Sequence, residues 1–94
     1  MRTVWKFPIV VTDRQHVIMP SGARVLAVHP QHEQLCLWAV VDPDAPKTSA
    51  IVHIAGTGHP LPSDIDEFRY VATAHLHRGS LVLHVFLREP AAAT

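Results

Sequence analysis

The sequence predicts an all-β domain, a small antiparallel sandwich or barrel of about six to seven strands with at most one short helical turn. Turn-forming Pro and Gly residues interrupt the chain about every ten residues, and apolar or alternating segments lie between them. No segment of more than about ten residues carries the i, i+3, i+4, i+7 apolar pattern of a helix. With 94 residues, 48% hydrophobic and 17% charged, the chain has a globular composition. We expect one domain over 1–90 and a frayed tail over 91–94.

The expected strands are the segments between these turns: 4–11, 15–19, 23–29, 34–41, 49–55, 68–77 and 81–88. Pro8 lies within the first segment, and proline lacks the N–H that a central strand needs. The first strand is therefore expected at a sheet edge or at a bulge. The helical turn is expected at 64–68, with Ser63 as its N-cap.

The last two segments are expected to form a hairpin. A two-residue turn at 78–79 pairs Thr73 with His84 and His75 with Val82. Because arginine disfavours positive φ, a bulged turn that uses only the glycine is the alternative. The register of the two-residue turn places both apolar sets on one face, as a half-buried sheet requires. That face comprises Tyr70, Ala72, Ala74, Leu76, Leu81, Leu83, Val85 and Leu87.

The segment 34–41 is apolar on both faces. A strand of this kind needs cover on each side, and the chain offers no helices for it. Exposed Leu35, Leu37 and Trp38 would form a patch typical of an interface. We therefore expect self-association, most simply a two-fold dimer or otherwise a higher homo-oligomer. The alternative is a closed barrel whose loops cover the outer residues.

The eight histidines suggest a second candidate site. His75 and His77 alternate onto one strand face, and His84 lies diagonally opposite on the same face in the expected register. Three imidazoles could hold a catalytic zinc, and the alternative is a solvated polar face. His53, within a strand, is expected to be buried and hydrogen-bonded.

The glycine-containing loop that starts at Gly56 is the most distinctive local feature. Gly56 and Gly58 let the backbone approach a ligand closely, and together with Thr57 and His59 they form the candidate ligand site. The loop lacks the lysine and the long helix of a phosphate-binding loop. The alternative is a tight connection stiffened by the two prolines that follow.

Charge and cysteine content restrict the partners. Eight Lys and Arg residues balance eight Asp and Glu residues, and the cations are scattered, so no nucleic-acid partner is expected. The single cysteine, Cys36, excludes an internal disulfide and is expected to be a buried apolar residue. Neither a signal-peptide pattern nor a membrane-spanning run is visible, so we expect a cytoplasmic protein.

Several short motifs resemble a family of short uncharacterised proteins encoded by bacteriophages, including phages of actinobacteria. The most specific are Cys-Leu-Trp-Ala at 36–39 and Gly-Thr-Gly-His-Pro at 56–60, together with Trp-Lys-Phe at 5–7 and the segment 76–86. That family is a domain of unknown function. The resemblance implies a phage origin and host cytoplasm as the location, and it transfers no catalytic residue.

These observations favour a non-enzymatic phage accessory protein that acts by binding, self-associates and engages a host or phage protein. No cofactor is expected. One alternative is a protein that binds or sequesters a nucleotide-like small molecule through the glycine loop. The other is a small metal-dependent enzyme that uses His75, His77 and His84.

Overall fold

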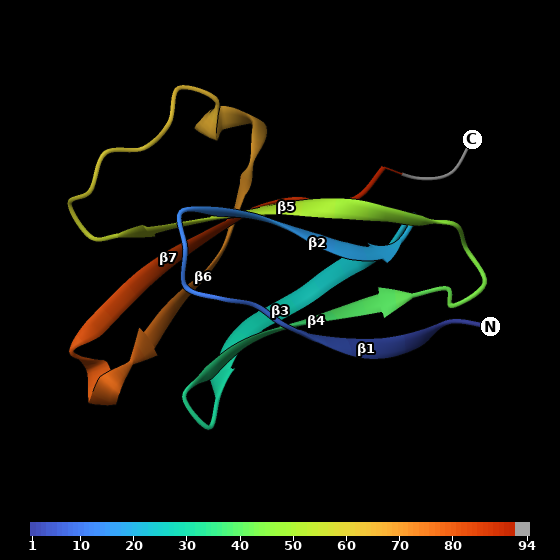
Figure 1. Ribbon diagram of the computed structural model, residues 1–94, viewed down its shortest axis with the longest axis horizontal. Helices are drawn as coiled ribbons and strands as arrows, with labels where there is room; N and C mark the ends of the chain where they lie inside the picture. Colours follow the sequence, from blue (N-terminus) through green and yellow to red (C-terminus); the bar gives the residue numbers. More distant parts are fainter. Residues whose placement is uncertain (92–94) are drawn as a thin grey trace.

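The computed structural model describes residues 1–91, which form strands and two single turns of 3₁₀ helix (Figure 1). Their bounds are β1 (Thr3–Pro8), β2 (Arg14–Pro20), β3 (Arg24–Gln31), β4 (Gln34–Val41), β5 (Lys47–Gly56), η1 (Ile65–Glu67), β6 (Arg69–Leu76), η2 (His77–Gly79) and β7 (Leu81–Arg88). The all-β expectation is confirmed, and the strand bounds agree with the predicted ones to within a few residues. Of the tail expected to fray, 92–94 lie outside the described residues, and the Ala91 carbonyl accepts a hydrogen bond from Gly22.

The strands form two antiparallel sheets. The three-stranded sheet has the order β1-β4-β3, and the four-stranded sheet has the order β2-β5-β7-β6. Pro8 ends β1 at a sheet edge, as its missing N–H requires. The η1 turn begins at Asp64 without a side-chain cap, so the expected role of Ser63 is wrong. In the described part of the chain no helix has the length and apolar character that a membrane crossing needs.

One hydrophobic cluster fills the space between the sheets. Alternate residues of each strand point into it, and Met19, Leu37, Val52 and Val85 are fully buried there. The Cα trace is only 15 Å deep along its shortest axis. Stacked sheets lie about 10 Å apart, so this depth holds two layers and no third. Each sheet therefore has one inner face and one outer face.

Within the chain, the inner face of strand β4 is fully covered and its outer face is partly covered. Leu35 and Leu37 point inward and are 1% and 0% exposed, because the four-stranded sheet covers them. On the outer face Cys36 is buried, and Trp38 is half-buried beside the imidazole of His29, with 6.3 Å between ring centres. Of the three residues expected at a self-association surface, only Trp38 therefore lies on an outer face.

The β6–β7 hairpin has the expected register, but residues 77–80 connect its strands, so the expected two-residue turn is wrong. Thr73 pairs with His84, and the two central turn residues, Arg78 and Gly79, have φ values of 57° and 87°. The Ser80 N–H donates to the His77 carbonyl and closes this turn. His77 also has a positive φ, 52°, so the left-handed conformation extends over three consecutive residues of the connection. His77 and Arg78 thus adopt a backbone conformation that residues other than glycine rarely have.

The expected inward position of Tyr70 is wrong. A register shift between Tyr70 and Ala72 marks a β-bulge in β6. Because side chains alternate with a period of two, one extra residue moves Tyr70 to the opposite face from Ala74 and Leu76. Tyr70 is 49% exposed on the outer face of the four-stranded sheet.

An ion pair closes the gap between the two sheets at edge strand β3. Glu89 accepts from the backbone N–H of Val25 (3.1 Å), and Arg69 donates to the Val25 carbonyl (3.2 Å). Arg69 Nε and Glu89 Oε1 are themselves 2.6 Å apart. The pair satisfies backbone groups that an edge strand leaves open. Partial burial acts to raise the pKa of Glu89, but the bonds from Arg69 and Val25 outweigh it, and the pKa lies below its usual value.

Replacing Glu89 by glutamine is expected to lower the free energy of unfolding at neutral pH by about 1 kcal/mol, since a partly exposed, charge-assisted bond is lost. A lowered carboxyl pKa stabilises the fold above the unfolded value, near 4.3, and this contribution disappears as pH falls through the folded value. Denaturant unfolding between pH 7 and pH 3 should therefore show a shallower acid loss for E89Q than for the wild type. The control is Asp66→Asn, whose exposed carboxylate forms no ion pair in residues 1–91. Equal pH slopes for E89Q and the wild type would contradict this role.

Candidate functional site

The connection between β5 and β6, residues 57–68, lies on the outer face of the four-stranded sheet. It joins strands that flank β7, so the chain must cross that strand. Its far end is fixed by Phe68, whose ring is 9% exposed between two guanidinium groups. The Arg14 and Arg88 carbons lie 4.8 Å and 5.2 Å from the ring centre, distances typical of cation–π contacts.

Two ion pairs reinforce this end of the connection. Both nitrogens of the Arg14 fork donate to the Asp64 carboxylate at 2.8 Å, and Arg88 donates to Glu67 at 2.8 Å. The hydrogen bond from Arg14 lowers the pKa of Asp64 and raises the pKa of Arg14 itself. The connection is therefore anchored far from its glycine-containing start.

The start of the connection is a tight turn. The His59 N–H donates to the Gly56 carbonyl (3.1 Å), and Gly58 at the third position has φ +85°. Positive φ at this position is the property of a type II turn, which glycine adopts without strain. The His59 ring lies directly on the Gly56 backbone, and a Cβ on Gly56 would stand 3.0 Å from it. The missing side chain thus sets the position of the imidazole.

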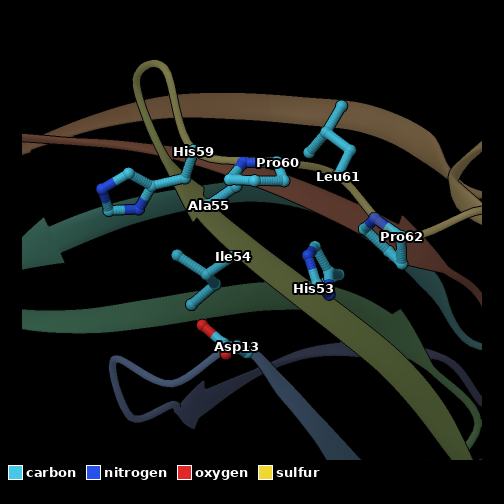
Figure 2. A pocket seen from close by; sticks show the side chains of 8 residues that line it. All are labelled: Asp13, His53, Ile54, Ala55, His59, Pro60, Leu61 and Pro62. Atoms are coloured by element: carbon cyan, nitrogen blue, oxygen red, sulfur yellow. The ribbon is translucent and has the colours of Figure 1, made fainter.

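His59 lines each of four hollows that lie around this turn in the described part of the chain. The largest, about 470 Å³, is called here the proline pocket. Figure 2 shows its lining residues Asp13, His53, Ile54, Ala55, His59, Pro60, Leu61 and Pro62. A second hollow, about 200 Å³, is called the aromatic pocket. Its lining residues are Ala55, Gly56, Thr57, Gly58, His59, Leu61, Tyr70, His84 and Phe86.

A hydrogen-bond network holds the aromatic pocket together. The two ring nitrogens of His84 bond to the hydroxyls of Thr57 (Nε2, 2.7 Å) and Tyr70 (Nδ1, 2.8 Å). Tyr70 also bonds to Thr73, and its ring meets Phe86 edge to face at 5.2 Å. Because hydroxyls both donate and accept, either tautomer of His84 satisfies the network. The glycine turn is thereby joined to the face of the β6–β7 hairpin.

The proline pocket contains a buried histidine with an unused nitrogen. His53 is 8% exposed beneath the connection, and its Nδ1 has no hydrogen-bond partner in residues 1–91. In Figure 2 its ring lies beside Pro62. The expected burial of His53 is confirmed, but the expected hydrogen bond is absent at Nδ1 among these residues. Unpaired buried nitrogens are uncommon in folded proteins.

The three histidines expected to cluster lie in different surroundings, although β6 and β7 keep the register predicted for His75 and His84. His77 lies in the hairpin turn, where its N–H donates to Glu33 (3.0 Å), and His75 is exposed on β6. His84 instead shares the aromatic pocket with His59. Across residues 1–91 no group of three or more His, Cys, Asp or Glu side chains could hold a metal ion.

The four residues expected to bind a ligand, Gly56, Thr57, Gly58 and His59, all line the aromatic pocket. Sequence reasoning missed Tyr70 and Phe86 as part of this site. Phe86 lies two residues after His84 on β7 and therefore points to the same face, so its outward direction could have been recognised from the pattern. Tyr70 carried no such signal, because the bulge that turns it outward leaves no mark in the sequence.

Comparison with known proteins gives a family and no further relative. Neither the curated proteins nor the solved structures contain a match to this chain. One family model matches residues 1–94, which is the whole length of this sequence. The chain therefore belongs to the family described as Domain of unknown function (DUF7352).

Proposed function

We propose that the protein binds a small planar heterocycle, such as a nucleobase or nucleoside, in the aromatic pocket. The observation that supports this function is the meeting of four ring side chains with a glycine turn at one hollow. Tyr70, His84 and Phe86 come from the hairpin, and His59 comes from the turn. Aromatic rings stack on the faces of heterocycles, with a contribution of about 1–3 kcal/mol per base.

The polar groups of the pocket match the edge of such a ligand. Both ring nitrogens of His84 are already bonded, but the Thr57 hydroxyl has hydrogen-bonding capacity beyond its bond to His84, and Gly58 allows close approach of the backbone. Lysine and arginine are not among the lining residues, so the pocket offers no cation for a phosphate chain. Its volume of about 200 Å³ lies below the range of about 300–1,000 Å³ that drug-sized ligands occupy. These properties favour a ring system over an intact nucleoside triphosphate.

The biological setting that we propose rests on the resemblance to phage proteins. We propose that the chain is a phage accessory protein that works in the host cytoplasm by binding rather than by catalysis. Sequestering a heterocyclic metabolite or signal is a function that such a small protein performs by affinity alone. The glycine turn, which is among the most specific motifs of the resemblance, lines the pocket.

A thermal-shift screen of nucleobases, nucleosides and nucleotides tests this function. A ligand that binds only the folded state raises the Tm, and we expect bases or nucleosides to do so more than their triphosphates. Phe86→Leu should weaken the best ligand about tenfold in calorimetry, because a stacking face worth about 1.4 kcal/mol is lost. Phe7→Leu is the matched control, since Phe7 is a half-buried phenylalanine of the other sheet.

Two results would contradict the proposal. One is a screen in which no heterocycle raises the Tm of the wild type. The other is an equal loss of affinity in F86L and F7L, which would assign the effect to general destabilisation.

A further inference from the structure

The outer face of the three-stranded sheet has no layer upon it in residues 1–91. Strand register places three rows of side chains across this face. The rows are Val4–Val40–Arg24, Lys6–Trp38–Ala27 and Pro8–Cys36–His29. The outer face of the other sheet, in contrast, carries the connection 57–68. We name these nine positions and Leu26, at the adjacent bulge, the open face.

The open face combines exposed apolar side chains with an aromatic centre. Val4 is 52% exposed and Leu26 is 47% exposed. Between their strands Trp38 is half-buried in the middle row. Tryptophan and arginine, both present on this face, are enriched among the residues that anchor a protein partner. This composition indicates a binding surface rather than a solvated one.

The charges of the open face all have one sign. Lys6 and Arg24 lie on it, and none of its positions carries a carboxylate. Neither cation has an ion-pair partner within the described chain, and Lys6 donates only to the neutral Gln31 (2.7 Å). Arg14, Arg69 and Arg88, in contrast, are each paired with an acidic residue. Arg24 lies near enough to Glu89 to help lower the pKa of that carboxyl but forms no direct ion pair with it, so both cations can still meet an external anion.

We propose that the open face binds an acidic segment of a partner protein, whose apolar side chain packs on Trp38 while its carboxylates meet Lys6 and Arg24. A second copy of this chain fits the face poorly, because two-fold pairing would bring cations together with no carboxylate between them. Nucleic acid fits poorly as well, because two cations release few counterions and the aliphatic side chains match no phosphate. This inference is independent of the ligand proposed for the aromatic pocket.

Selection from a display library of random short peptides tests the open face on the intact protein. We expect the enriched peptides to combine Asp or Glu with an aromatic or aliphatic residue. The double variant K6E/R24E should weaken the best peptide at least about tenfold, because like charges then face each other. Binding should also weaken as salt rises toward physiological strength, where the screening length is about 8 Å. Arg78→Glu is the matched control, since Arg78 is an exposed cation in the β6–β7 connection and is not part of the open face.

The same proteins distinguish an acidic peptide from the other partners that the open face could bind. Thermal unfolding should show that K6E/R24E is folded, and the affinity for a ligand of the aromatic pocket should be unchanged. Enriched peptides without acidic residues, or equal affinity for wild type and K6E/R24E, would overturn the proposal. A wild-type dimer in sedimentation that Trp38→Ala dissociates would assign the face to a second copy. Binding of a DNA or RNA oligonucleotide that K6E/R24E abolishes, without any peptide binding, would assign it to nucleic acid.

Discussion

Replacing Leu37 by alanine is expected to lower the free energy of unfolding by about 3 kcal/mol. Leu37 is 0% exposed at the centre of β4, and the four-stranded sheet packs on it. Truncation removes buried methyl groups and leaves a cavity that the rigid sheets cannot close. Denaturant unfolding followed by tryptophan fluorescence measures the loss. Leu26→Ala is the control, because Leu26 is 47% exposed and its truncation should change stability by less than about 0.5 kcal/mol.

Measuring the stability loss at several protein concentrations distinguishes a core position of Leu37 from a position in an interface between copies. As a core residue, it should give the same loss in dilute and in concentrated solution. As an interface residue, it would give a loss that grows with dissociation of the oligomer, since the stability of an oligomer depends on protomer concentration. A concentration-dependent effect would restore Leu37 to the self-association surface that the sequence predicts.

Local patterns in the sequence were enough to predict most of the strands. The bounds of β4 and β7 agree with the predicted ones, because each is an apolar segment between residues that cannot continue a strand. The hairpin register followed from the same alternation and from the glycine at its turn. These features depend on residues that are close together in the chain.

The errors concern cover and curvature, which depend on distant residues. Leu37 was expected to lack a cover within one chain, but the four-stranded sheet supplies it. Tyr70 was expected in the core, and a bulge placed it outside. The site shows the same division: the glycine turn was found from its own motif. The hydrogen bond between Thr57 of this turn and His84 joins residues 27 positions apart in the chain, and no local pattern encodes it.

Replacing Phe68 by alanine is expected to lower the free energy of unfolding by about 3 kcal/mol and to loosen the connection 57–68. The ring is 9% exposed, and both guanidinium groups on it would lose an apolar surface and a cation–π partner. Phe68→Leu keeps most of the apolar contact and removes the π face, so its loss should be about 1 kcal/mol. The difference between the variants separates packing from the cation–π contribution.

Hydrogen exchange at the backbone amides of the connection 57–68 measures how firmly Phe68 anchors it. Hydrogen exchange should accelerate in F68A at the His59 N–H, which closes the glycine turn. The aromatic pocket is built from that turn on one side and from the hairpin on the other, so its ligand affinity should fall as well. Val85 in the core provides the contrast, because Val85→Ala should cost stability while His59 keeps its protection relative to the global value. Unchanged exchange at His59 in F68A would mean that the turn is held by the Thr57–His84 bond alone, and the anchor would then be separate from the site.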